Sequence, residues 1–368
     1  MPQPERTALR CRPLVISCHQ CHLGQMIGGS IPMTRASGIG PLPRLLEKAS
    51  GVSAVEAVFR SVQIPVQVLD HPELEVPFGA MVRLFDSAAK SAGDPLFGLR
   101  VGLQMSPGDF GPWVKTAKTA PTLRHALDRL SAALQMHQPE GAFSLDVAQG
   151  MAVWTYIPPD FSVLPIRQHA DHVLPVMIAF CRSYLGAEWL PVRARMMYAD
   201  PGLKAARFSL LAVPFAFDGP GVAICFPDSL LGKSLPVASG VRDLNTDDKE
   251  LGSMTNVPST SLPSRDMAIE SIVALRILDG QVDIEGAAAL ANISVRSLQR
   301  SLSQAGTTYS DVLNRVRDRK AREFLLQTDM PVTGIAYSLG YSDPANFTRA
   351  FVRRNGTPPQ HFRTSRTM

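Results

Sequence analysis

The chain has 368 residues, 45% of them hydrophobic and 19% charged, a globular composition and a length that predicts two or three domains. Five cysteines in a chain of this length exclude a disulfide-stapled miniprotein, and the nine-residue apolar stretch Val173–Cys181 is too short for a membrane-spanning helix. The chain has 37 basic and 32 acidic residues, a net charge of +5. From Arg265 onward there are 14 basic and 10 acidic residues, which leaves 23 basic and 22 acidic residues before it. Most of the net positive charge therefore lies at the C-terminal end.

Residues 1–39 are expected to form a disordered leader, because this segment shows no periodic apolar pattern. It contains Cys18-His-Gln-Cys21-His22, the spacing of a c-type haem attachment site or, with His19, of a small zinc site. No signal peptide accompanies the motif, and we interpret it as a chance occurrence, with no metal or cofactor expected. Translation from Met26 or Met33 remains open.

Residues 40–237 are expected to form an α+β domain that senses a ligand and dimerises. Helices and strands do not alternate in strict βαβ order, which argues against a doubly wound sheet. Apolar residues recur at helical spacing in residues 76–89 and 122–136 and alternate in a hairpin that turns at Gln149-Gly150. The expected helices are 41–49, 76–89, 122–136 and 163–185, the last bent near Pro175, and the expected strands are 143–147, 151–157, 192–198 and 222–226.

Two pairs of residues in this domain are candidate ligand contacts. Trp154 and Tyr156 share one face of an expected strand, and His169 and His172 share one face of an expected helix. Ordinary core packing and structural histidines are the competing interpretations. The triplet Gly232-Lys233-Ser234 is not a phosphate-binding loop, because Pro227 stands where that motif requires its first glycine.

Residues 238–264 are rich in Gly, Ser, Thr, Asp, Asn and Pro and are expected to be a flexible linker. Everything from residue 265 to 368 is helical in pattern and contains an internal repeat with an offset of 49 residues. The matched pairs are Ala287/Ala336, Leu290/Leu339, Ala291/Gly340, Ser294/Asp343, Leu298/Phe347, Arg300/Arg349 and Leu302/Phe351.

Each copy of the repeat has the layout of a helix-turn-helix unit. A short helix carries Ala and Leu toward the core, a small residue permits a turn, and Ser294 or Asp343 caps the second helix. Pro344 occupies the first helical position, which proline favours. The second helix buries positions i and i+4 and leaves a polar face free to enter a major groove.

The second copy carries the motif Ile335-Ala336-x-x-Leu339-Gly340-Tyr341-x-Asp343-x-x-x-Phe347-x-Arg349-Ala350-Phe351, followed by Gly356-Thr-Pro-Pro359 and Phe362-Arg363. This motif resembles the signature of AraC/XylS-type transcription regulators. The stretches Asp94–Gly102 and Gly108–Gly111 more loosely resemble the arabinose-binding type of N-terminal sensor domain in that family. The resemblance implies two DNA-reading helices, with these residues at the DNA: Arg296, Ser297, Gln299 and Arg300 on the first, and Ala345, Asn346, Arg349 and the phosphate-contacting Arg353 and Arg354 on the second. For Arg300 and Arg349, an ion pair or hydrogen bond inside the domain is the alternative to a DNA contact.

The resemblance also implies a function. We expect a cytoplasmic, homodimeric, ligand-responsive regulator, not an enzyme, that binds double-stranded DNA and activates transcription through RNA polymerase. One alternative is a haem- or metal-binding enzyme or sensor with an appended DNA-binding domain, and another is a DNA-binding protein that senses no ligand. The effector and the operator cannot be identified from the sequence.

Overall fold

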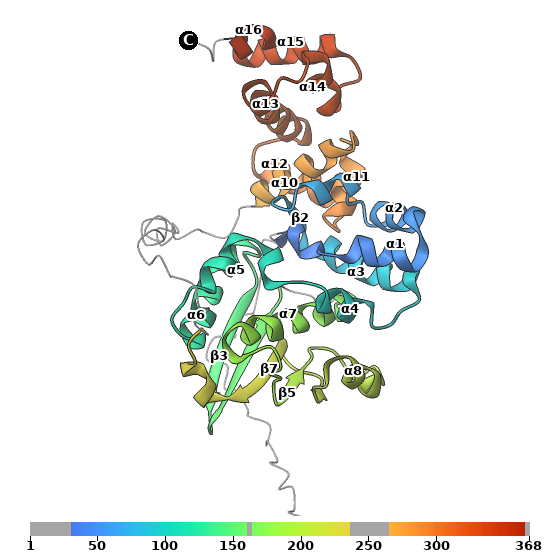
Figure 1. Ribbon diagram of the computed structural model, residues 1–368. Coiled ribbons are helices and arrows are strands. Elements are labelled where there is room, and N and C mark those ends of the chain that lie inside the picture. Colours follow the sequence, from blue (N-terminus) through green and yellow to red (C-terminus); the bar gives the residue numbers. More distant parts are fainter. Residues whose placement is uncertain (1–30, 160–163, 236–264, 365–368) are drawn as a thin grey trace, which may run out of the picture.

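The computed structural model describes residues 31–159, 164–235 and 265–364 (Figure 1). An N-terminal part with helices and sheets is followed by a C-terminal part made of helices alone, as the sequence predicts. None of the helices in these ranges is both long enough and apolar enough to cross a membrane.

The expected leader extends too far into the folded chain. Residues 36–39 form the short helix η1 (Ala36–Ile39), and β1 (Met33–Arg35) pairs antiparallel with β2 (Glu75–Pro77). Ile31, Met33 and Ile39 are buried in the core. The prediction of disorder to residue 39 is therefore wrong for residues 31–39, because a strand this short takes its stability from a partner about 40 residues away. The motif at Cys18–His22 lies outside the described residues.

A layer of helices follows β1. It consists of α1 (Leu42–Ser50), α2 (Val52–Ser61), η2 (Val66–Asp70), α3 (Phe78–Ala92), α4 (Phe97–Leu103), η3 (Pro107–Phe110), α5 (Pro112–Ala117), α6 (Leu123–Ala133) and η4 (Leu134–Met136). The expected helices 41–49, 76–89 and 122–136 correspond to α1, α3 and α6.

Two glycines of α4 explain part of the family-like stretch Asp94–Gly102. A Cβ atom added at Gly98 would lie 2.1 Å from the carbonyl oxygen of Gln168, and one added at Gly102 would lie 2.2 Å from that of His172. Both carbonyls belong to α7 (Arg167–Leu185). The glycines therefore let the two helix backbones touch, which fixes the position of α7.

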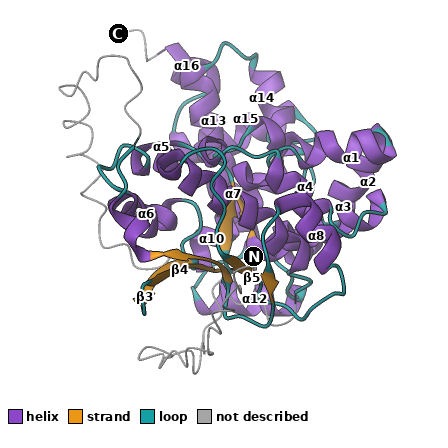
Figure 2. Ribbon diagram, turned by 60° about the horizontal axis from the view of Figure 1, so that its bottom comes forward, coloured by secondary structure: helices purple, strands orange, loops and turns teal. Residues whose placement is uncertain are grey.

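Five strands form the larger sheet, in the order β3-β4-β7-β5-β6. They are β3 (Ala142–Ala148), β4 (Met151–Ile157), β5 (Arg193–Arg195), β6 (Phe215–Ala216) and β7 (Val222–Pro227), and only the pair β5–β6 is parallel. The expected hairpin is confirmed, with both Gln149 and Gly150 at positive φ. α7 contains Pro175 and packs on β7, and α6 packs beside β3 (Figure 2).

The short helices α8 (Lys204–Leu211) and η5 (Asp228–Gly232) complete this part. Arg207 of α8 donates two hydrogen bonds, of 2.6 and 2.7 Å, to the carboxylate of Asp171 on α7. Both side chains are fully buried, and the bidentate pairing fixes α8 against α7.

Seven helices make up the described C-terminal part: α10 (Arg265–Leu278), α11 (Ile284–Leu290), α12 (Val295–Gln304), α13 (Tyr309–Gln327), α14 (Val332–Ser338), α15 (Pro344–Asn355) and α16 (Pro359–Thr364). The two expected helix-turn-helix units are α11–α12 and α14–α15, and α13 joins them (Figure 1). The predicted linker at residues 238–264 lies outside the described residues.

The apolar side chains form two clusters. One fills the space between the larger sheet, α5, α6 and α7. The other runs without a break from β1 and α1–α3 into the C-terminal helices, and it contains Phe59 and Val76 as well as Ile269, Leu290 and Phe347. The two parts of the chain therefore share a hydrophobic core in addition to polar contacts.

Candidate functional site

The helix α12 presents a polar face next to its capped start. Ser294 caps it, with its hydroxyl oxygen accepting a hydrogen bond of 3.1 Å from the backbone N–H of Ser297. Arg296, Gln299 and Arg300 are exposed. Leu298 and Leu302 are buried on the opposite side, as the i, i+4 spacing predicts. The half-buried Ser297 also accepts a 2.9 Å hydrogen bond from the Ser294 hydroxyl, so it belongs to the cap.

The helix α15 has the same construction. Asp343 caps it, with Oδ1 accepting a hydrogen bond of 2.9 Å from the backbone N–H of Ala345, and Pro344 stands at the first helical position. Ala345, Asn346, Arg349, Arg353 and Arg354 are all exposed, and Phe347 and Phe351 are buried. Arg349 donates a hydrogen bond to the side-chain oxygen of Asn346, so these two side chains act as one polar group.

The arginines of α13 are engaged inside the protein. Arg315 and Arg319 form ion pairs of 3.2 and 2.7 Å with Glu270 of α10. Arg322 pairs with Asp318 on its own helix. Part of the positive charge of the C-terminal part is therefore used in contacts within the protein and is not available to a DNA partner.

Arg317 holds the turn of the second unit. It donates hydrogen bonds of 2.8 and 2.7 Å to the carbonyl oxygens of Leu339 and Gly340, and its guanidinium lies 4.2 Å from the centre of the Tyr341 ring. Gly340 has a φ of +72°. In the first unit the left-handed residue is Asn292, with a φ of +59°, and not Ala291 as the 49-residue offset predicts. The turn between α14 and α15 is one residue longer than the turn between α11 and α12. At the turn, Gly340 therefore corresponds to Asn292, an offset of 48 residues and not 49.

The exposed arginines that remain lie on the two expected reading helices. Arg296 and Arg300 belong to α12, and Arg353 and Arg354 belong to α15. Within the described ranges, no hydrogen bond or ion pair to another side chain occupies any of these four. Planar guanidinium groups at such positions suit bidentate contact with phosphates and guanine edges.

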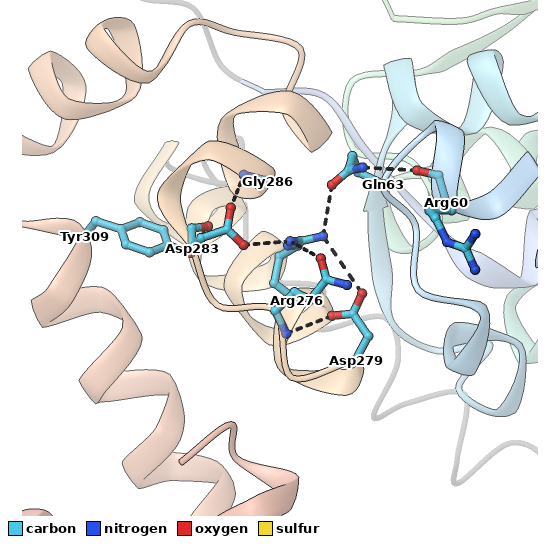
Figure 3. A network of polar contacts seen from close by, with 8 residues as sticks. Arg60, Gln63, Arg276, Asp279, Asp283, Gly286 and Tyr309 are labelled. Carbon is cyan, nitrogen blue, oxygen red and sulfur yellow. Dashed lines mark hydrogen bonds and ion pairs between the residues drawn. The ribbon is translucent and has the colours of Figure 1, made fainter. Parts of the chain in front are cut away.

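A buried arginine connects the C-terminal part to the N-terminal part (Figure 3). Arg276 of α10 is 2% exposed and donates hydrogen bonds of 3.2 Å to Gln63 beyond α2 and 3.0 Å to Asp283. Asp279 lies 3.9 Å from the same guanidinium. The other carboxylate oxygen of Asp283 accepts a 2.6 Å hydrogen bond from the backbone N–H of Gly286 and caps α11. The first helix-turn-helix unit is thus tied to the N-terminal part through Arg276, and Arg83 of α3 adds a 3.4 Å hydrogen bond to the carbonyl oxygen of Leu290 in α11.

A second contact joins the two parts near β1. The hydroxyl of Ser271 on α10 donates a 2.9 Å hydrogen bond to Glu75 of β2. Glu75 is paired in register with Arg35 of β1, and the neighbouring Thr34 lies 3.4 Å from Nε2 of His137. A continuous series of contacts therefore leads from His137 to α10.

His137 and all four candidate ligand residues line one cavity. Trp154 and Tyr156 come from β4, and His169 and His172 come from α7, so the structure brings together two pairs that the sequence places separately. The free volume inside the cavity is about 70 Å³, and the cavity is open to solvent. His137 was not predicted. It follows η4, and no sequence pattern marks it.

The comparisons with known proteins agree with this architecture. Residues 53–235 match the family described as the arabinose-binding domain of AraC transcription regulator, N-terminal, and residues 287–365 match a helix-turn-helix domain family. The chain belongs to the AraC/XylS family of transcription regulators. As an AraC/XylS regulator it combines an N-terminal ligand-binding domain with a C-terminal helix-turn-helix DNA-binding domain.

Curated relatives of this AraC/XylS regulator match over most of their length. The ornithine utilization regulator of Pseudomonas aeruginosa is 26% identical over 85% of this chain and 91% of its own. The HTH-type transcriptional regulator VirS of Mycobacterium tuberculosis is 24% identical over 91% of this chain and 94% of its own. The crystal structure of the transcriptional regulator CdpR from Pseudomonas aeruginosa is 21% identical and aligns over 85% of this chain and 97% of its own with a TM-score of 0.39.

The alternative of a haem- or metal-binding enzyme finds no support in these comparisons, since the two curated relatives named above are both called regulators. In the described part of this AraC/XylS regulator, no three His, Cys, Asp or Glu side chains are grouped to hold a metal ion.

Proposed function

We propose that the chain acts in the cytoplasm as a homodimer that activates transcription by RNA polymerase when a small molecule binds its N-terminal domain. The observation that carries the DNA-binding part is the distribution of arginines. The fold engages those of α13 in contacts within the protein, and the exposed arginines of the described C-terminal helices that have no such contact lie on α12 and α15. Two such helices on one chain suit two adjacent major-groove segments.

The two helices have different roles in this proposal. Arg296 and Gln299 lie in the first turns of α12, the end of a recognition helix that meets base edges. Pro344 and Ala345 offer no polar side-chain atoms at the corresponding end of α15, so the second unit reads less sequence. Arg353 in the last turn of α15 contacts phosphate, which positions the protein without specifying sequence.

Regulation follows from the contacts between the two parts. The effector binds best to one arrangement of the N-terminal part against α10, and DNA binds best to the same arrangement. Effector binding therefore raises the affinity for DNA, and DNA binding raises the affinity for the effector. Gln63 and Glu75 are the residues through which that arrangement reaches α10.

A binding titration tests the division of roles. A target duplex selected from random sequences and a scrambled duplex of the same composition are titrated with the full chain at several salt concentrations. Arg296→Ala and Gln299→Ala should each cost about 1–3 kcal/mol on the selected duplex and leave the scrambled one almost unchanged. Arg353→Ala should weaken both duplexes alike and lower the salt slope by about one unit.

Arg124→Ala is the matched control, because Arg124 is an exposed arginine of α6 in the other part of the chain. This variant should bind both duplexes like the unmodified protein. If Arg296→Ala and Gln299→Ala weakened both duplexes equally, α12 would not be the reading helix, and α15 would take that role.

A further inference from the structure

Several different elements line the cavity that contains the four candidate residues. β4 and α7 form two of its walls, and α5, α6 and η3 contribute Trp113, Leu130 and Phe110. Thr34 of β1 and Gly38 of η1 close it toward the contacts that lead to α10. The free volume inside this lining is about 70 Å³, several times the roughly 10–15 Å³ that one water molecule needs, and the cavity is open to solvent.

The lining carries no ionic charge. Not one Asp, Glu, Lys or Arg is among the residues that line the cavity. The histidines are neutral at neutral pH, since burial lowers the pKa of His137 to about 3 and that of His172 to about 4. Burial also lowers the pKa of His169 well below its ordinary value. An ionised ligand would lose its hydration here and find no opposite charge, which is costly.

The walls nevertheless contain polar atoms that need partners. Nε1 of Trp154, Nδ1 of His137 and Nδ1 of His169 are buried and have no hydrogen-bond partner within the described residues. Trp154 is 1% exposed, and an indole N–H can only donate, so its complement is an acceptor such as a ligand oxygen. A buried polar group without a partner is destabilising, and a ligand that supplies the partner removes that cost.

One further acceptor is fixed in the wall. His172 places Nδ1 2.6 Å from the carbonyl oxygen of His169, and a carbonyl can only accept, so the proton of neutral His172 is on Nδ1. Its Nε2 is then an acceptor and suits a hydroxyl group. Apart from these nitrogens, the surroundings are mainly aromatic and aliphatic, with Phe143 stacked on Trp154 and Phe180 nearby.

We propose that this cavity is the effector site and that it takes an uncharged, mainly apolar molecule with a carbonyl or hydroxyl oxygen that accepts a hydrogen bond from Trp154. The inference rests on the proposed effector response and adds the chemical class of the effector. The apolar body can be an aromatic ring or an acyl chain, and amino acids, amines and carboxylates in their ionised forms are excluded.

A fluorescent probe of this class tests the proposal directly. Prodan is an uncharged naphthyl ketone whose emission shifts to the blue in an apolar site. Titrated into the full chain at pH 7.5, it should bind saturably. Acetophenone and methyl octanoate should displace it, whereas benzoate, benzylamine and octanoate at equal concentration should not. The one of these two that displaces prodan at the lower concentration indicates whether the apolar body of the effector is an aromatic ring or an acyl chain. The proposal would be overturned if prodan did not bind saturably. It would also be overturned if an ionised competitor displaced prodan at the same concentration as the corresponding neutral compound.

Two substitutions locate the probe. Trp154→Phe keeps an aromatic ring and removes the N–H, and it should weaken prodan binding about fivefold, the value of one neutral hydrogen bond. Trp189→Phe is the matched control, because Trp189 packs against Phe226 and does not line the cavity. It should leave affinity unchanged. Equal losses in the two variants would place the probe elsewhere.

A third substitution fills the cavity. Val176 of α7 lines it and is half-buried, so Val176→Trp should abolish prodan binding. A cooperative urea unfolding transition like that of the unmodified protein shows that this variant is folded. If the unmodified protein binds DNA and not prodan, the effector class is wrong and the regulator function stands. If it binds prodan and no duplex at any salt concentration, the DNA-binding proposal fails.

Discussion

Replacing Gly286 by alanine should disturb the polar network around Arg276. A Cβ atom at position 286 would lie 2.2 Å from Nη2 and 2.5 Å from Cζ of the guanidinium. Arg276 is 2% exposed and cannot move into solvent without leaving its bonds to Gln63 and Asp283. The new methyl group therefore competes with the contact between the two parts of the chain.

The magnitude follows from two opposing effects. Overpacking a buried site costs about 1–3 kcal/mol, and the displaced guanidinium puts this variant near the upper end. Alanine is about 1 kcal/mol better than glycine inside a helix. The free energy of unfolding should therefore fall by about 1–2 kcal/mol. In a chain that already carries Arg276→Met the obstacle is absent, and Gly286→Ala should stabilise by up to about 1 kcal/mol.

A double-mutant cycle measured by urea unfolding checks this reasoning. The unmodified protein, Gly286→Ala, Arg276→Met and the double variant are compared under one buffer condition. The coupling energy between the two positions should be about 2–3 kcal/mol. If Gly286→Ala stabilised the unmodified protein and the Arg276→Met variant equally, the guanidinium of Arg276 would not lie against α11. The network around Arg276 would then not connect the two parts of the chain.

Three further predictions follow from other contacts. Gly98→Ala should lower the free energy of unfolding by about 3 kcal/mol, because the methyl group meets backbone and not a movable side chain. Gly79→Ala is the matched control in α3, where the Cβ finds nothing closer than 3.5 Å, and it should be neutral or stabilise by up to about 1 kcal/mol; equal urea midpoints of the two variants would refute the close helix contact. Arg317→Met should loosen the turn of the second helix-turn-helix unit and weaken binding to the selected duplex about tenfold. An unchanged affinity would show that the turn keeps its conformation without the hydrogen bonds of Arg317. The neutral forms of His137 and His172 stabilise the fold fully at a pH well above 6.5, and this contribution is lost as the pH falls toward 4, because the unfolded chain takes up protons first. At pH 5.5 the free energy of unfolding should be lower by about 1 kcal/mol per histidine, and a flat stability curve between pH 7 and 5.5 would contradict this.

The sequence predicts the C-terminal part well because its signals are local. Ser294, Asp343 and Pro344 act within one helical turn, so their capping roles can be recognised without knowing the rest of the fold. Arg317 is different. Its partners are carbonyl oxygens 22 and 23 residues away, and an arginine on a helix looks the same whether it contacts DNA or the protein's own backbone.

The N-terminal part shows the same limit more strongly. The sequence predicts the β3–β4 hairpin because the turn and the alternating apolar and polar residues of both strands lie within one short segment, residues 142–157. β1 was missed because Met33 pairs with Pro77, and nothing within residues 31–39 reveals that partner. The cavity depends on contacts of this kind throughout, since His137 reaches Trp113 and Thr34 only after the chain has folded.

The shared hydrophobic core limits how this regulator can be rebuilt from parts. Chimeras in which one sensor is attached to another relative's DNA-binding half treat the halves as exchangeable modules. Here Ile269 of α10 belongs to the same apolar cluster as Phe59 and Val76, so a foreign half would bring an unmatched surface to that junction. A chimera should respond to its effector only when the α10 surface and its N-terminal counterpart are taken from the same parent.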